Sequence, residues 1–194
     1  MARGLNAHGV AVGVVGYDLA PEVTIAEIID QIRHACLFMW LRTGRRMMVY
    51  GHSAGGHLAG AMVATEWHEL YPKTPADLVP AAYSASGVFD LTPLVQVTMA
   101  QDLRLDDAEA RRVSPLFWPA PKGRVFDAVA GSLESSEFLR QSRVIADTWG
   151  KAGAQTRFEA IQGTNHFTVI DAMPDPQSAM VGRLAELAHE GQNQ

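Results

Sequence analysis

One serine lies in a five-residue pattern typical of a nucleophile. Gly51-His52-Ser53-Ala54-Gly55 fits G-x-S-x-G; an apolar run, Met47–Tyr50, precedes it and an Ala-, Leu- and Met-rich stretch, Ala54–Glu66, follows it. A strand before this pattern and a helix after it place the serine on a sharp, exposed turn. The flanking glycines let neighbouring backbone approach without a Cβ clash. We expect Ser53 to attack a carbonyl carbon, while the Ala54 N–H at the helix start stabilises the oxyanion.

A serine hydroxyl is a poor nucleophile at its free pKa and needs an oriented base. His166 follows an apolar run, Thr156–Ile161, through a short loop. Active sites of parallel sheets gather at this carboxyl edge, so His166 is the expected base. His52 and His57 flank the serine too closely in sequence for their rings to act as its base. The other histidines are expected to be surface or boundary residues: His8, His34, His68 and His189.

The third member should be a carboxylate that follows the strand preceding that of His166. Glu134 comes three residues after Gly131, just beyond the predicted strand Arg124–Ala130. It is therefore the expected acid. The chain order nucleophile, acid, base is one in which such triads occur.

Four other carboxylates are weaker candidates for the acid. Asp127 lies inside the predicted strand and should point to a face of the sheet. Glu137 lies one helical turn beyond Glu134 and should point outward. Asp147 and Asp171 are the remaining alternatives.

Apolar runs that alternate with helical periodicity should position these residues. Five runs are predicted to be strands: Val10–Tyr17, Met47–Tyr50, Leu78–Ser84, Arg124–Ala130 and Thr156–Ile161. Four stretches are predicted to be helices: Val23–Arg42, which Gly44 should end, Ala54–Glu66, Glu134–Lys151 and Pro176–His189. This alternation predicts an α/β fold, a mostly parallel sheet flanked by helices, in a single domain spanning 1–194.

One span, Phe89–Lys122, breaks the alternation. Its four prolines predict an irregular, lid-like insertion over the end of the sheet, because proline interrupts both helices and strands. Trp118 in this insertion and Tyr17 at the end of the first predicted strand are candidate substrate-binding residues. Ordinary lid packing is the competing interpretation for Trp118, and a turn role beside Asp18 for Tyr17.

Composition excludes several classes of protein. The 194 residues carry 16 Lys and Arg against 21 Asp and Glu, a net charge of −5, which disfavours binding to nucleic acid. Apolar stretches end well before the roughly 18 residues that span a bilayer, so no membrane partner is expected. The single cysteine, Cys36, should be a buried apolar residue. We expect no metal, no cofactor and, without a secretory signal, a cytoplasmic location.

Longer segments resemble the α/β-hydrolase superfamily and, within it, the kynurenine formamidase and related carboxylesterase group. The resemblance is carried by five segments, 17–21 (YDLAP), 51–59 (GHSAGGHLA), 86–91 (SGVFDL), 134–142 (ESSEFLRQS) and 165–167 (NHF). It implies Ser53 as nucleophile, Glu134 where relatives often carry an aspartate, and His166 as base. It also implies a small-molecule ester or aryl formamide substrate, such as an N-formylkynurenine-like compound.

The sequence departs from this pattern at one point. Relatives carry a His-Gly-Gly segment upstream whose N–H groups supply further oxyanion donors, and this sequence has none. It resembles a member without its first strands, and loss of a donor costs about 2.7–4 kcal/mol of transition-state stabilisation.

Two hypotheses of function follow. The first is a serine hydrolase that cleaves esters or aryl formamides through an acyl-enzyme. The second is a truncated or non-catalytic hydrolase-like chain that acts in binding or assembly. An open sheet edge would then pair with a second copy as a homodimer.

Overall fold

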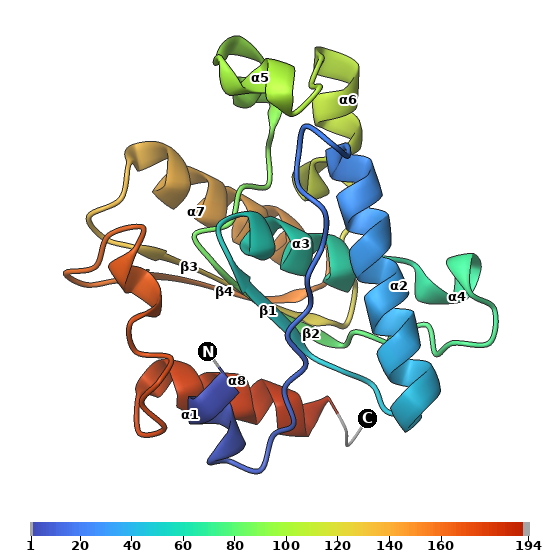
Figure 1. The fold of residues 1–194 in the computed structure, drawn as a ribbon. Helices are drawn as coiled ribbons and strands as arrows, with labels where there is room; N and C mark the ends of the chain where they lie inside the picture. The colour runs from blue at the N-terminus through green and yellow to red at the C-terminus, as the bar shows by residue number, and fades with distance from the viewer. Residues whose placement is uncertain (1, 192–194) are drawn as a thin grey trace.

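A computed structural model describes residues 2–191 (Figure 1). Four parallel strands form one sheet in the order β1-β2-β3-β4. Their bounds are β1 Val49–His52, β2 Ala81–Ala85, β3 Val125–Gly131 and β4 Gln155–Ile161. Because all four strands are parallel, their carboxyl ends meet at one edge of the sheet.

Helices cover both faces of this sheet (Figure 1). One face carries α3 (Ala54–Val63) and α7 (Ser136–Lys151), with α2 (Ile25–Thr43) packed against α3. The other face carries α8 (Ala179–Glu190) and α1 (Ala2–Asn6). At least one helix lies between each pair of consecutive strands along the chain. The predicted α/β fold is confirmed. Within residues 2–191, no helix is long and apolar enough to cross a membrane.

Local sequence signals set the bounds of α2. The hydroxyl of Thr24 accepts the N–H of Glu27, whose carboxylate accepts the N–H of Thr24, so the two residues form a capping box. Gly44 has φ +64° and donates its N–H to the carbonyl of Trp40. This left-handed conformation is accessible to glycine without strain, which confirms that Gly44 ends the helix.

Two apolar cores lie on the two faces. Between the sheet and α2, α3 and α7, the rings of Phe89, Phe126 and Trp149 pack edge to face. On the other face, Tyr83 of β2 and Val129 of β3 pack against apolar residues of α8. Cys36 is buried in the first core, and burial raises the pKa of its thiol to about 12, consistent with an apolar packing role.

Two buried charges are fully partnered. Arg124, just before β3, donates to the carbonyls of Val63, Thr65 and Ala76 at 2.7–2.8 Å. Asp127 in β3 accepts from Arg183 of α8 at 2.8 Å. Asp127 therefore points to a face of the sheet, as predicted.

The span 89–122 contains no strand, only short helical segments. These are η1 (Thr92–Gln96), α5 (Met99–Asp102), α6 (Asp107–Arg112) and η2 (Pro115–Phe117). Two further short helices lie outside this span: α4 (Trp67–Leu70) follows α3, and η3 (Thr168–Ile170) follows β4. Proline occupies the first turn of both η1 and η2, where its missing N–H is not needed. Figure 1 shows α5 and α6 together, near the start of α2.

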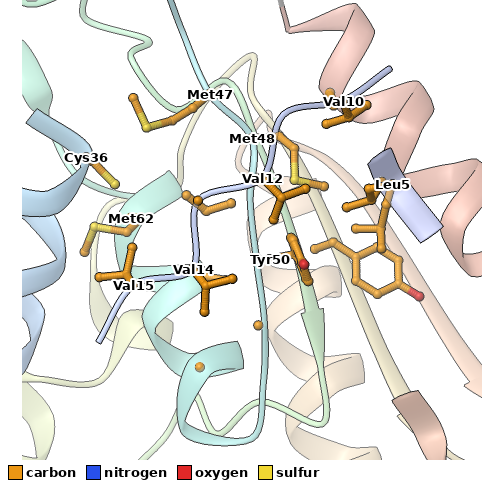
Figure 2. A pocket seen from close by; sticks show the side chains of 18 of the residues that line it. Leu5, Val10, Val12, Val14, Val15, Cys36, Met47, Met48, Tyr50 and Met62 are labelled. Carbon is orange, nitrogen blue, oxygen red and sulfur yellow. The ribbon is translucent and has the colours of Figure 1, made fainter. Parts of the chain in front are cut away.

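The predicted strand Val10–Tyr17 is wrong, because the structure places no strand there. This segment is irregular and runs beside β1, across an apolar hollow of about 560 Å³. Val10, Val12 and Val14 of this segment and Met47, Met48 and Tyr50 all line the hollow, and Figure 2 shows their side chains. Within the described residues, no backbone hydrogen bond joins this segment to β1, and a ladder consists of such bonds.

Most other predicted elements exist but differ at their ends. The strand expected at Leu78–Ser84 starts at Ala81, directly after Pro80, which cannot donate to a ladder. The helix expected from Glu134 starts at Ser136. The closing helix, expected from Pro176, starts after Ser178, whose hydroxyl accepts the N–H of Val181.

Candidate active site

Ser53 lies between β1 and α3 in a strained conformation. Its φ is +56° and ψ is −116°, a region that residues with a Cβ rarely adopt. A Cβ on Gly51 would lie 2.2 Å from the carbonyl oxygen of Gly55, so this position requires glycine. The elbow predicted from G-x-S-x-G is present.

The second glycine of the pattern does not have the expected role. A Cβ built on Gly55 meets no atom within 4 Å. The close approach occurs one residue later, where a Cβ on Gly56 would lie 2.6 Å from the Ser84 hydroxyl and 2.9 Å from the Gly87 Cα. Gly56 therefore allows α3 to approach β2.

The structure brings Ser53, Glu134 and His166 together. Oε2 of Glu134 lies 2.8 Å from Nδ1 of His166, and Nε2 of the same ring lies 3.1 Å from Oγ of Ser53. Ser53 follows β1, Glu134 follows β3 and His166 follows β4, all at the carboxyl edge of the sheet. Both distances allow hydrogen bonds, so a proton can pass from the serine to an imidazole held in one tautomer.

The Glu134 carboxylate is fully buried and held by two further donors. Oε1 accepts the N–H of Gly131 at 2.6 Å and the hydroxyl of Ser86 at 2.5 Å. Ser86 follows β2, is completely buried and has φ +53°. Sequence reasoning missed its role; the signal was a serine at the carboxyl end of the strand between those of nucleophile and acid.

The loop that carries His166 is ordered by its own side chains. Oδ1 of Asn165 accepts the N–H groups of Phe167 and Thr168 at 2.9 and 3.0 Å. The Ser132 hydroxyl, in the loop after β3, accepts the N–H of Gly163 at 3.0 Å. These bonds attach the start of the loop to the acid side of the site.

Three rings contact the imidazole of His166, and that of Phe167 does so edge-on, with centroids 5.7 Å apart. The centroid of His52 lies 4.7 Å from that of His166 and that of Phe138, on α7, lies 4.6 Å away. His52 also donates Nε2–H to the carbonyl oxygen of His166 at 2.7 Å. Burial lowers the pKa of His52, and the hydrogen bond to the His166 carbonyl opposes this shift in part.

His57 has a separate, structural position. It is buried on α3, and its Nδ1–H donates to the carbonyl of Val88 at 2.8 Å. Burial lowers the pKa of His57 to about 4, so this ring is neutral at pH 7.

The weaker acid candidates lie away from the histidine. Glu137 forms an ion pair with Arg140 at 2.7 Å and accepts from Gln141, and these bonds, that from Arg140 first, lower its pKa. Asp147 and Asp171 are exposed. None of the three forms a hydrogen bond with His166 within the described residues.

Helix α7 also holds the start of the insertion. The buried side-chain oxygen of Gln141 accepts the N–H groups of Phe89 and Asp90 at 2.7 and 2.9 Å. Its amide nitrogen donates to the carbonyl of Asp90. The helix that touches His166 through Phe138 therefore also anchors the first residues of the insertion.

Ala54 lies at the first position of α3, directly after Ser53. The N–H groups of a helix's first turn have no partner within the helix, and they carry the positive end of its dipole. The backbone N–H of Ala54 thus lies beside the Ser53 hydroxyl at the positive end of this helix.

The two candidate substrate-binding residues lie in different places. Tyr17 lines the hollow beside β1 that His52 and Gly55 also line. Trp118 donates its indole N–H to the carbonyl of Arg112 and lies under the Arg33 guanidinium, 5.8 Å from its ring centroid. These contacts attach Trp118 to α6 and α2. Contact of Tyr17 or Trp118 with a substrate stays a prediction.

In the described part of the chain, no group of three or more His, Cys, Asp or Glu side chains could hold a metal ion. The carboxyl edge of the sheet presents a hydroxyl, an imidazole and a carboxylate side by side.

Known proteins resemble this chain in sequence and in fold. Residues 1–170 match a family model described as alpha/beta hydrolase fold. The chain is 29 % identical to a kynurenine formamidase of Danio rerio, over 96 % of this chain and 65 % of that protein. It is 30 % identical to a kynurenine formamidase of Salmo salar, over 90 % of this chain and 61 % of that protein. The chain thus spans less than two thirds of these curated relatives.

Solved structures agree on the fold. A crystal structure from a Silicibacter species matches with a TM-score of 0.81 and 29 % identity, covering 93 % of this chain and 66 % of that one. An esterase of Pyrobaculum calidifontis matches with a TM-score of 0.73 over 98 % of this chain and 68 % of that one. Its identity is 16 %, so it supports the fold alone.

Proposed function

Because the chain belongs to the α/β-hydrolase fold family, we propose that it is a serine hydrolase of small carboxylic esters or aryl formamides. One observation carries the proposal. Glu134, His166 and Ser53 form a continuous line of hydrogen-bonding atoms, with spacings of 2.8 and 3.1 Å. This is the arrangement in which a serine becomes a nucleophile.

The proposed reaction uses each of these groups in turn. Ser53 Oγ attacks the carbonyl carbon while Nε2 of His166 takes its proton, and Glu134 stabilises the imidazolium through Nδ1–H. The Ala54 N–H donates to the oxyanion. As the tetrahedral intermediate collapses, His166 gives the proton to the leaving alcohol or amine, and an acyl-serine remains. A water molecule, deprotonated by His166, then attacks the acyl carbon; the bond to Ser53 Oγ breaks, His166 returns the proton to Oγ, and the acid leaves.

The substrate class rests on the named relatives. Two proteins about 30 % identical to this chain are kynurenine formamidases, so an aryl formamide is the first substrate to test. A formyl group is the smallest acyl group, and an ester of a short acid presents the same carbonyl to Ser53. Tyr17 and Trp118 are proposed to contact the substrate's larger, apolar part.

Labelling with a fluorophosphonate tests the nucleophile directly. We expect one adduct on Ser53 by peptide mass spectrometry and none in Ser53→Ala. Turnover of an N-formyl arylamine and of a short-chain aryl ester then ranks the two substrate classes. A folded wild-type protein that neither takes up the label nor turns over either substrate would contradict the proposal.

A second candidate function, self-association, is favoured by the open edge of β1. Its outer side faces the apolar hollow of about 560 Å³, and no strand of the described residues pairs with it there. Such an edge is a template for a strand of another molecule, and a second copy of this chain could supply it. Size-exclusion chromatography with light scattering tests this. A monomer at all concentrations, with robust turnover, would contradict it.

A further inference from the structure

His52 makes two contacts with His166 that the proposed proton transfer does not use. Its Nε2–H donates to the main-chain carbonyl of His166 at 2.7 Å, and its ring lies 4.7 Å from the His166 ring. His52 is the last residue of β1, directly before Ser53. The residue that holds the backbone of the base is therefore covalently joined to the nucleophile.

This contact spans the whole sheet. Ser53 follows β1 and His166 follows β4, with β2 and β3 between them. Three strand spacings of about 4.8 Å separate the two strands by about 14 Å. The loop after β4 must extend back over the edge by this distance before the imidazole can reach Ser53.

The other bonds of this loop do not reach β1. Asn165 orders the loop internally, and Ser132 attaches it to the loop after β3. Across the described residues, the His52 side chain provides the hydrogen bond between the main chain of His166 and the nucleophile's strand. A shift of the loop along the edge would change the 3.1 Å distance from His166 Nε2 to Ser53 Oγ.

The charge state of His52 suits this role. A neutral ring with its proton on Nε2 makes the observed bond, whereas a charged ring would repel the imidazolium that His166 becomes. The titratable groups that act on His52 are His166 and Glu134. Burial lowers the pKa of His52 and so favours the neutral form, in agreement with this geometry.

We propose that His52 is a positioning residue, which fixes the His166 loop relative to Ser53 through its bond to the His166 carbonyl. The inference rests on the proposed function, in which His166 is the base. It also explains why the second residue of the G-x-S-x-G pattern is a histidine here. A hydrogen-bond donor must reach the carbonyl oxygen of His166, and a neutral imidazole supplies this donor without adding a charge.

Two substitutions separate the donor from the ring. His52→Gln keeps an N–H donor at about the distance of Nε2, whereas His52→Leu keeps bulk and removes the donor. We expect His52→Leu to lower kcat on an aryl ester about 100-fold with KM nearly unchanged, because a misplacement of about 1 Å has this effect. We expect His52→Gln to retain kcat within about threefold. His34→Gln, on the exposed side of α2, is the matched control and should match the wild type.

A resonance readout on the resting protein keeps this test independent of turnover. In protein with ¹⁵N-labelled histidine, the Nδ1 proton of His166 bonded to Glu134 should give a sharp signal in the wild type, His34→Gln and His52→Gln. It should broaden by exchange with water in His52→Leu. If His52→Leu keeps both the sharp signal and kcat, or if His52→Gln loses both as fully, the proposal is overturned. Failure of Ser53 to label would contradict the proposed function instead, while the resonance series would still decide the role of His52.

Discussion

The hydroxyl of Ser86 donates a 2.5 Å hydrogen bond to Oε1 of Glu134, the carboxylate oxygen that His166 does not use. The N–H of Gly131 donates to the same oxygen at 2.6 Å. Two donors on one oxygen fix the plane of the carboxylate, so that the other oxygen faces Nδ1 of His166. A glutamate side chain has one more rotatable bond than an aspartate, so these two donors restrain a longer side chain.

Removal of this donor should weaken catalysis and leave the fold intact. We expect Ser86→Ala to lower kcat about 10- to 100-fold, because a hydrogen bond to a charged group contributes about 1.5–3 kcal/mol. Ser135→Ala is the matched control, since Ser135 is exposed beside Glu134 and its side chain makes no cap bond. Steady-state hydrolysis of an aryl ester by both variants measures the difference. Equal rates in the two variants would contradict a role for Ser86.

The acid can be identified by a pair of substitutions. Glu134→Gln should lower turnover by about 10⁴, the size of the effect when a serine protease's acid becomes an amide, because the amide favours the wrong imidazole tautomer. Glu137→Gln should stay within a few-fold, since Glu137 pairs with Arg140 on the surface of α7. Steady-state kinetics of both purified variants, with circular dichroism as a folding check, distinguishes them. The reverse result would place the acid on α7.

The two glycines of the elbow should respond in opposite ways to alanine. Gly51→Ala should destabilise the protein by about 3 kcal/mol or more, because its Cβ would overlap the Gly55 carbonyl. Gly55→Ala should be neutral or up to about 1 kcal/mol stabilising, because its Cβ meets open space and alanine favours a helix. Urea unfolding of the two variants and the wild type gives both values. Similar losses in both would show that the elbow needs glycine at each position.

The buried His57 should make stability depend on pH. Its pKa is lowered to about 4 in the folded state, while the unfolded chain takes up the proton near pH 6.5. Stability is therefore full above about pH 6.5 and falls as the pH drops toward 4, by about 2 kcal/mol between pH 7 and pH 5. His57→Asn places an N–H donor near the position of Nδ1, keeps a bond to Val88 within reach and does not titrate.

Urea unfolding of the wild type and His57→Asn at pH 7, 6 and 5 isolates this contribution. Other titrating groups are common to both proteins. The free energy of unfolding of the wild type should therefore fall by about 2 kcal/mol relative to that of His57→Asn between pH 7 and pH 5. A constant difference would show that His57 does not remain neutral in the folded protein.

The sequence predicted the parts of the site that depend on local pattern. The order of Ser53, Glu134 and His166 along the chain, each after an apolar run, was enough to predict that they meet, because parallel strands share one carboxyl edge. The structure confirms that these three side chains lie together. Their catalytic roles remain proposals.

Features that depend on pairing between distant segments could not be predicted. Val10–Tyr17 has the composition of a strand, but a strand also needs a neighbour, and the sequence alone does not say whether one is present. The positions of Ser86 and His52 at strand ends can be read from the sequence, but their partners cannot. Their roles depend on which strands are adjacent, and β2 becomes the support of the acid only once the order β1-β2-β3-β4 is known.

The placement of nucleophile and base on the two outer strands of this sheet has a kinetic consequence. An intermediate that has joined β1, β2 and β3 holds Ser53 in its elbow and Glu134 at its strand end, but it has no imidazole between them. During refolding, the serine can gain its reactivity only after β4 has docked at the far edge. The rate at which reactivity toward a fluorophosphonate returns therefore reports when the complete four-stranded sheet has formed, whatever the order in which its strands join.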